Sequence, residues 1–258
     1  MVKKYLRKFR DLLTMDVGIF ALRQLANQLE GSPFRLAYLE GKGGYTVFAA
    51  SDRNGIARYI IKVANSFKGN ITKRVISEKR TQYVYLEPSG RFERERLALN
   101  ILSVHGLGPR PVLSHEQYSV EEYISGAKFS EMFVRGGRDA GEILRKVLAA
   151  VARMHWLGVT HGDLRPYNIL VEGDRVRFID FEHMLDPKKF TGPQMRAFDY
   201  LILLDELTRI DAKGLLKENA GGIRAGISAR MPVDFTKEDV DKVMEDFSYA
   251  RELSGYFF

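Results

Sequence analysis

The sequence contains no cysteine among its 258 residues, which excludes disulfides, thiolate metal sites and cysteine nucleophiles. It also lacks an apolar run of about 20 residues, the length that a membrane-spanning helix needs. Residues 1–10 are rich in Lys and Arg and lack the apolar segment of a secretory signal peptide. We therefore expect a cytoplasmic protein with no transmembrane segment.

The composition favours a folded chain with an anionic partner. Lys and Arg number 40 against 33 Asp and Glu, which gives a net charge of +7. Such a balance suits a nucleotide, a nucleic acid or a membrane surface, and does not choose among them. Hydrophobic residues make up 45% of the chain, and its length allows one large domain or two lobes.

One polar string organises the rest of the chain. It reads His161-Gly-Asp-Leu-Arg-Pro-Tyr-Asn168, and two short apolar runs follow it, around a turn at residues 172–175. A hairpin there would bring Asn168 and Asp180 toward one point, because they flank its two strands. Carboxylate and amide oxygens suit Mg²⁺, so the pattern predicts a magnesium site with Asp163 beside it, free to orient a hydroxyl.

This string resembles the catalytic core of the protein-kinase-like superfamily, whose loop reads H-x-D-x-x-x-x-N and whose metal motif is D-F-G. The resemblance implies an α+β, two-lobed fold, with a β-rich N-lobe and a mainly helical C-lobe. It implies ATP and Mg²⁺ as cofactors, Asp163 as the catalytic base, and Asn168 and Asp180 as the metal ligands. We place an N-terminal helical extension at 1–33, the N-lobe at 34–124 and the C-lobe at 125–258.

The predicted N-lobe has its own nucleotide-binding pattern. A glycine-rich turn between two strands runs from Gly41 to Phe48, although it lacks the third glycine of the kinase loop. Lys62 lies in a β-branched strand, where a lysine is costly to bury unless it is paired, and the resemblance assigns it to the phosphates. The implied nucleotide-binding residues are Gly41, Gly43, Gly44, Val47, Lys62, Glu95, Glu122, Tyr123 and Ile124.

The expected partner of Lys62 is a glutamate on the next helix. Phe92, Glu95, Leu99 and Leu102 recur at helical spacing, so Glu95 should point toward the core. Glu93 is the alternative. The segment 65–91 before this helix carries several basic residues and is either a solvated excursion or a docking surface for an anionic partner.

Later segments extend the resemblance. Glu122–Ile124 would form the hinge that meets the adenine. A helix is expected from a cap at Asp139 to Leu157, with His155 in a packing role. Asp199, inside an apolar helix, resembles the kinase aspartate that braces the catalytic loop.

Three departures point to an atypical branch. Gly162 replaces the Arg of H-R-D, no A-P-E motif follows Asp180, and the chain is small. These features are similar to the RIO family and to the small kinase of the KEOPS complex. They imply a serine/threonine kinase that is active without activation-loop phosphorylation, with Arg165 near the transferring phosphate. The acceptor would be a folded protein or ribonucleoprotein partner, the enzyme itself or a small molecule.

Two other functions stay open, as does the role of the N-terminus. A small-molecule kinase of the aminoglycoside or choline kinase type would share the core, and Ile179–Glu182 resembles a choline-kinase segment. An ATP-binding assembly factor with little turnover would need the nucleotide and the basic surface, including a possible RNA contact. Residues 2–13 predict a basic amphipathic helix, which either packs on the domain or binds a charged surface, and a second helix capped at Thr14 or Asp16.

Overall fold

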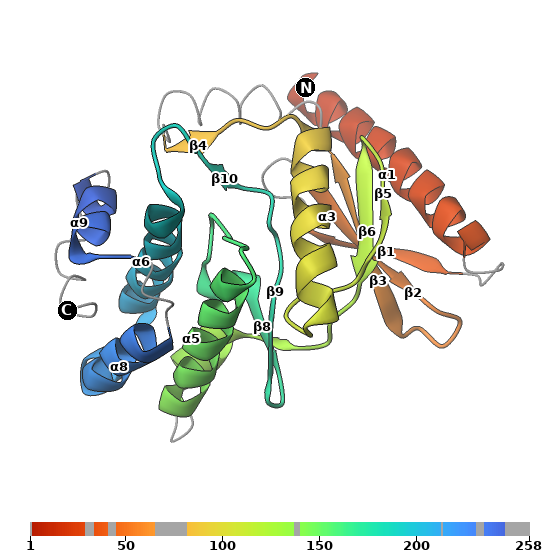
Figure 1. Ribbon diagram of the computed structural model, residues 1–258. Coiled ribbons are helices and arrows are strands. Elements are labelled where there is room, and N and C mark those ends of the chain that lie inside the picture. Colours follow the sequence, from red (N-terminus) through yellow and green to blue (C-terminus); the bar gives the residue numbers. More distant parts are fainter. Residues whose placement is uncertain are drawn as a thin grey trace. The chain divides into compact units, whose positions relative to one another are not determined.

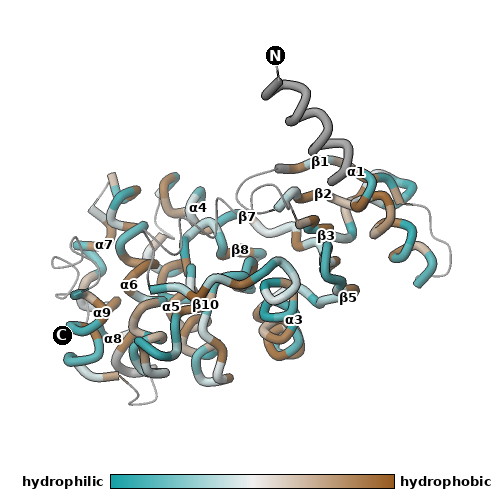
Figure 2. The backbone as a smooth tube through the Cα atoms, turned by 90° about the horizontal axis from the view of Figure 1, so that it is seen from above, coloured by the Kyte–Doolittle hydropathy of each residue, from teal (hydrophilic) through white to brown (hydrophobic). Residues whose placement is uncertain are grey.

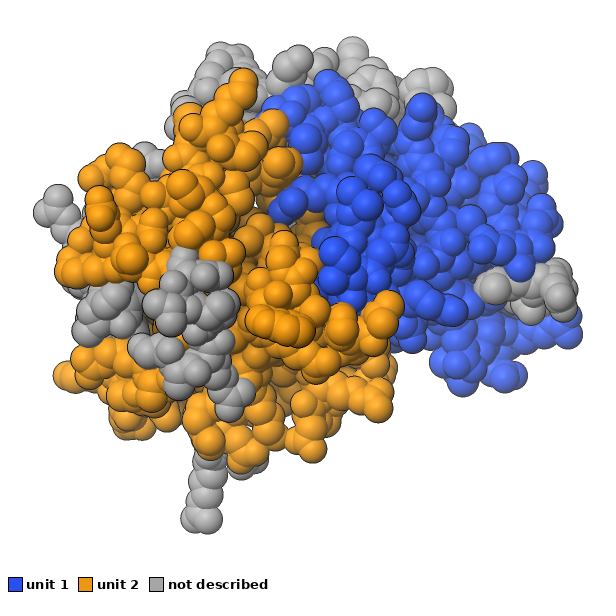
Figure 3. All heavy atoms as spheres, viewed as in Figure 1, with its two compact units in different colours: residues 1–81, 85–103, 109–124 blue, residues 82–84, 104–108, 125–258 orange. Residues whose placement is uncertain are grey.

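A computed structural model describes residues 2–28, 34–40, 45–64, 82–136, 140–212, 214–230 and 235–245. The chain divides into two compact units, coloured in Figure 3. Unit 1 comprises residues 1–81, 85–103 and 109–124, and unit 2 comprises residues 82–84, 104–108 and 125–258.

Unit 1 is built on a five-stranded antiparallel sheet in the order β1-β2-β3-β6-β5. Its elements are α1 (Val2–Gln28), β1 (Arg35–Glu40), β2 (Tyr45–Ser51), β3 (Ala57–Ala64), α3 (Pro88–Val104), β5 (Pro111–Ser114) and β6 (Tyr118–Glu122). Residues of β3 alternate between the two faces, as strand geometry requires. Ile61 and Val63 are fully buried on one face, in a core with Phe48 and Val120.

Helices cover both faces of this sheet (Figure 1). Ala21 and Leu25 of α1 are fully buried in the core with Ile61 and Val63. On the other face, Glu95 of α3 meets Lys62, which alternates with those core residues along β3. The expected break near Thr14 or Asp16 is wrong, because α1 is one continuous helix. No proline interrupts residues 2–28, and the helix continues through both of the polar residues that were expected to cap a second one.

Unit 2 is mainly helical. Its elements are β4 (Tyr83–Val84), β7 (Ala127–Lys128), α4 (Phe129–Arg135), α5 (Ala140–Trp156), the 3-10 turn η1 (Pro166–Asn168), β8 (Ile169–Glu172), β9 (Arg175–Phe178), β10 (Met184–Leu185), α6 (Gly192–Ile210), α7 (Leu215–Glu218), α8 (Ala220–Arg230) and α9 (Lys237–Glu245). Helix α5 packs against α8, and α6 packs against α9. Apolar and polar segments alternate along these helices, as expected for helices buried on one side (Figure 2).

Two local features fix where the functional residues of unit 2 lie. The β8–β9 hairpin pairs Ile169 with Phe178, so its ends bring Asn168 next to Ile179. Helix α6 begins with a capping box, in which Thr191 and Gln194 satisfy each other's backbone N–H groups. The predicted α+β architecture, with a β-rich first part and a mainly helical second part, is confirmed. Among the described helices, none is both long enough and apolar enough to cross a membrane.

Candidate active site

The predicted site residues fall into two groups, one in each unit. In unit 1, the Nζ of Lys62 lies 2.5 Å from Oε1 of Glu95 and 3.3 Å from Oε1 of Glu121. All three side chains are buried. The predicted Lys62–Glu95 ion pair is confirmed, and Glu93 is instead exposed and paired with Arg96. The helical spacing of Phe92, Glu95 and Leu99 was therefore the decisive signal.

Strand register explains how the sheet presents Lys62. Val47 on β2 and Ser119 on β6 are its cross-strand partners, so their side chains share its face of the sheet. Glu121 lies two residues beyond Ser119 and returns to the same face. Sequence reasoning missed Glu121. The sequence alone contained no signal for it, because the alternation from Ser119 to Glu121 points to Lys62 only once β6 is known to pair with β3.

The end of β6 carries the three residues predicted to meet an adenine. The N–H of Glu122 donates to the carbonyl of Arg110, and the N–H of Tyr123 donates to the carbonyl of Arg58. These two donors are used inside the sheet, so a base at this strand end would need other backbone groups. Gly41, Gly43 and Gly44 lie outside the described residues, as does segment 65–81 with Lys68, Lys73, Arg74, Lys79 and Arg80.

In unit 2, the hairpin positions the predicted metal ligands. The N–H of Ile179 donates to the carbonyl of Asn168 at 3.0 Å, which places Asp180 one residue past that bond. Asp180 has a φ of 72°, in the left-handed region that non-glycine residues rarely adopt. Such a conformation costs about 1–3 kcal/mol and is concentrated at functional sites, where the surrounding structure enforces it.

The loop that begins at His161 and Gly162 is held by Asp199 of α6. The carboxylate of Asp199 is fully buried and accepts hydrogen bonds from the N–H groups of His161 and Gly162, both at 2.8 Å. His155 Nε2 lies 2.9 Å from the same carboxylate, which agrees with the packing role expected for it. Gly162 has a φ of 82°, and this left-handed conformation favours glycine where H-R-D kinases have arginine. The predicted brace by Asp199 is confirmed.

His161 joins the loop to the hairpin as a neutral ring. Its Nδ1 accepts from the N–H of Asp163 at 3.3 Å, so its Nε2 is the nitrogen that donates to the carbonyl of Ile179 at 3.0 Å. Burial lowers the pKa of His161 below its ordinary value, and the nearby carboxylates of Asp199 and Asp163 oppose this only in part. The ring also packs on Phe181, with 4.4 Å between centroids.

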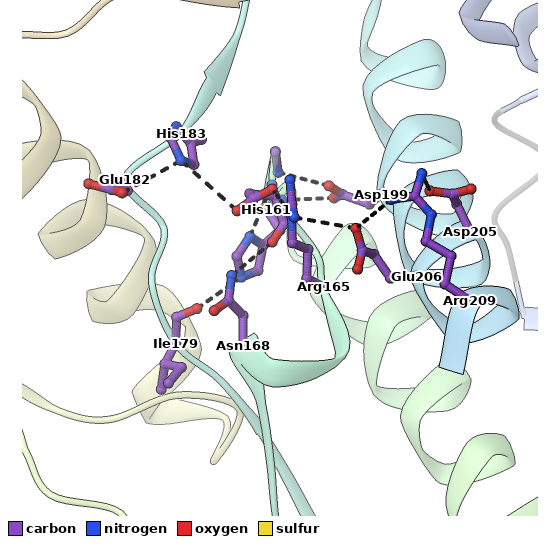
Figure 4. A network of polar contacts seen from close by, with 12 residues as sticks. His161, Arg165, Asn168, Ile179, Glu182, His183, Asp199, Asp205, Glu206 and Arg209 are labelled. Atoms are coloured by element: carbon purple, nitrogen blue, oxygen red, sulfur yellow. Dashed lines mark hydrogen bonds and ion pairs between the residues drawn. The ribbon is translucent and has the colours of Figure 1, made fainter. Parts of the chain in front are cut away.

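Asp163 belongs to a network of polar contacts that includes Arg165 and His183, both labelled in Figure 4. Its Oδ1 accepts a hydrogen bond from Nε of Arg165 at 2.8 Å, and its Oδ2 lies 4.0 Å from Nε2 of His183. Arg165 in turn reaches Oε1 of Glu206 on α6, at 3.3 Å. Burial opposes the charge of Arg165, but the carboxylates of Asp163 and Glu206 outweigh it and raise the pKa of its guanidinium. Sequence reasoning missed both Glu206 and His183.

The donor set in unit 2 suits a hard cation. Nδ2 of Asn168 donates to the carbonyl of Asp163 at 3.0 Å, so the amide is oriented and its oxygen is the atom left for a ligand. With the carboxylate of Asp180, it supplies oxygen ligands of the kind that Mg²⁺ prefers. Within the described ranges, no group of three or more His, Asp or Glu side chains could hold a metal alone.

Comparison with known proteins identifies the family of this chain and several relatives. Residues 47–199, more than half of the chain, match the family model of the RIO domain. The chain is 30% identical over 166 residues to the serine/threonine-protein kinase cds1 of Schizosaccharomyces pombe. The matched region covers 59% of this chain and 33% of that protein. It is 31% identical over 178 residues to the serine/threonine-protein kinase PKH2 of Candida albicans. That match covers 67% of this chain and 17% of the relative.

A third relative has a different kind of name. The chain is 26% identical over 162 residues to a probable bifunctional tRNA threonylcarbamoyladenosine biosynthesis protein of Methanosarcina barkeri, across 59% of this chain and 28% of that protein. The chain thus spans no more than about a third of the length of these three relatives.

Proposed function

This chain belongs to the RIO-domain family of atypical kinases, and we propose from this premise that it is an ATP- and Mg²⁺-dependent phosphotransferase. The observation that carries the proposal is the polar arrangement of unit 2. Asp163 is buried and oriented by Arg165, in a loop that Asp199 braces and beside a hairpin that presents Asn168 and Asp180. The preferred acceptor is a serine or threonine hydroxyl.

Each group of residues would have a distinct task. Asp163 would orient the acceptor hydroxyl and take its proton on Oδ2, since Oδ1 already accepts from Arg165. Lys62 would contact the phosphates, with Glu95 and Glu121 holding its ammonium in place. Asn168 and Asp180 would hold Mg²⁺, which when bound neutralises charge on the phosphate oxygens.

The activity would not depend on phosphorylation of the segment after Asp180. Helix α6 begins at Gly192, so residues 181–191 alone join Asp180 to it, with no room for an extended peptide platform. Gly162 supplies no cation to receive a loop phosphate. A folded protein, the chain itself or a small alcohol would therefore be the acceptor.

The proposal is tested with labelled ATP and Mg²⁺, after phosphatase treatment of the protein. Transfer is measured to cell protein, to the chain itself, to generic peptides and to a small-molecule extract. We expect transfer to protein, and we expect Asp163→Asn to lower turnover by about 10² or more, with nucleotide affinity little changed. Transfer to small alcohols alone would favour the choline-kinase type, and tight ATP binding without transfer would favour an assembly factor.

A further inference from the structure

The two oxygens of the Asp163 carboxylate have different surroundings. Oδ1 accepts a hydrogen bond from Nε of Arg165 at 2.8 Å. Oδ2 accepts no hydrogen bond from the part of the chain that the structure describes, and Nε2 of His183 stands 4.0 Å away. Whatever holds Arg165 on Oδ1 therefore decides which oxygen is left for an acceptor.

Arg165 is held at both ends of its guanidinium. Nε binds Asp163, and Nη1 lies 3.3 Å from Oε1 of Glu206. The ring of Tyr167 lies 5.9 Å from Cζ of the same guanidinium. An arginine side chain has many rotamers, so a single contact at Nε does not fix the orientation of its guanidinium. A second carboxylate, at Nη1, restricts that orientation further.

Glu206 belongs to the helix that already braces the loop. It lies seven residues after Asp199 on α6, which is two helical turns, so both acids project from one face. Asp199 fixes the backbone of the loop through His161 and Gly162, and Glu206 fixes a side chain of the same loop. Figure 4 shows both acids reaching the loop from α6. Glu206 is itself 3.7 Å from Nη1 of Arg209, one turn further on.

We propose that Glu206 is a positioning residue for phosphoryl transfer. It keeps the guanidinium of Arg165 on Oδ1 of Asp163 and so reserves Oδ2 for the acceptor hydroxyl. This role rests on the proposed function of Asp163 as the base. A positioning residue touches neither the acceptor nor the nucleotide, so the removal of Glu206 should change turnover more than nucleotide binding.

The test compares two substitutions at one position. Glu206→Met keeps a long helix-forming side chain without an acceptor, and Glu206→Gln keeps an acceptor oxygen for Arg165. We expect Glu206→Met to lower kcat between about tenfold and a hundredfold, the range for a misplaced catalytic group, and Glu206→Gln to keep most of the turnover. The KM for ATP should stay within about twofold in both variants. Asp205→Asn is the matched control, because Asp205 neighbours Glu206 on α6 but pairs with Arg209 and not with Arg165.

A double-mutant cycle separates positioning from a general effect on folding. If Glu206 acts through Arg165, then Glu206→Met should cause no further loss of kcat in an Arg165→Met background. Equal losses in both backgrounds, or a normal kcat in Glu206→Met, would overturn the inference. Asp163→Asn is measured in parallel, since a fully active Asp163→Asn variant would instead refute the proposed function. Should Glu206→Met fail to fold, Glu206→Asp is put through the same cycle, because its carboxylate is one methylene shorter and should not reach Nη1 of Arg165. A normal kcat in Glu206→Asp, or an equal loss in both backgrounds, would overturn the inference in the same way.

Discussion

Asp199→Asn gives a test of the brace that does not depend on any assumed activity. The carboxylate of Asp199 is fully buried and has three donors around it, namely the N–H groups of His161 and Gly162 and Nε2 of His155. Asparagine offers one acceptor oxygen and one NH₂ donor in the same space. Either orientation of the amide therefore places its NH₂ against a backbone N–H of the loop.

The magnitude follows from counting these contacts. If the amide oxygen replaces Oδ1, the N–H of His161 loses its acceptor; if it replaces Oδ2, the N–H of Gly162 loses its acceptor. One unsatisfied buried N–H costs about 1–3 kcal/mol, and the remaining bonds lose the assistance of the charge. We expect a total loss of about 2–4 kcal/mol in the free energy of unfolding.

The assay is urea unfolding of Asp199→Asn beside Asp205→Asn. Asp205 forms an ion pair with Arg209, whose side chain is 54% exposed, so Asp205→Asn should change stability by no more than about 1 kcal/mol. The midpoint for Asp199→Asn should fall while the slope with urea stays the same. Equal midpoints for the two variants would show that the three bonds to Asp199 do not stabilise the loop.

Three further predictions follow. Asp180→Ala should weaken Mg²⁺-dependent ATP binding as well as turnover, as measured by titration calorimetry with and without Mg²⁺; unchanged binding would remove Asp180 from the metal site. Lys62→Met should destabilise the protein by about 3–5 kcal/mol in urea unfolding, because it leaves Glu95 and Glu121 buried without their cation, and adding Glu95→Gln should recover part of the loss. Burial holds the pKa of His161 below its ordinary 6.5, so below about pH 6.5 the unfolded chain binds a proton that the folded chain does not bind. The free energy of unfolding should therefore fall as the pH drops below about 6.5. The free energy of unfolding of His161→Asn, measured from pH 5 to pH 8, should lack this part of the pH dependence. An unchanged pH dependence would assign it to other groups.

Local patterns were sufficient to predict part of the site. Helical periodicity identified Glu95 over Glu93, and the β-branched run around Lys62 indicated a buried, paired lysine. The hairpin followed from two apolar runs and a turn, and the structure has it at β8 and β9. These predictions succeeded because each depends on residues that are near one another in sequence or repeat with a fixed period.

Long-range contacts were harder to predict. Glu121 faces Lys62 only because β6 pairs with β3, and a strand pairing between distant segments leaves little mark on either sequence. Glu206 meets Arg165 across 41 residues of chain. Arg165 was expected near the transferring phosphate, and that role stays a prediction; the structure shows its guanidinium between two carboxylates.

The motion of the loop at His161 and Gly162 depends on α6, because Asp199 of that helix binds both residues. Surface loops usually open with little free energy, whereas core helices open only with the whole fold. The N–H groups of His161 and Gly162 end on a buried side chain of α6, so their amide hydrogens are shielded from exchange for as long as that helix is in place. This stretch of irregular backbone thereby takes its rigidity from α6, and a change that loosens the helix would loosen the loop with it.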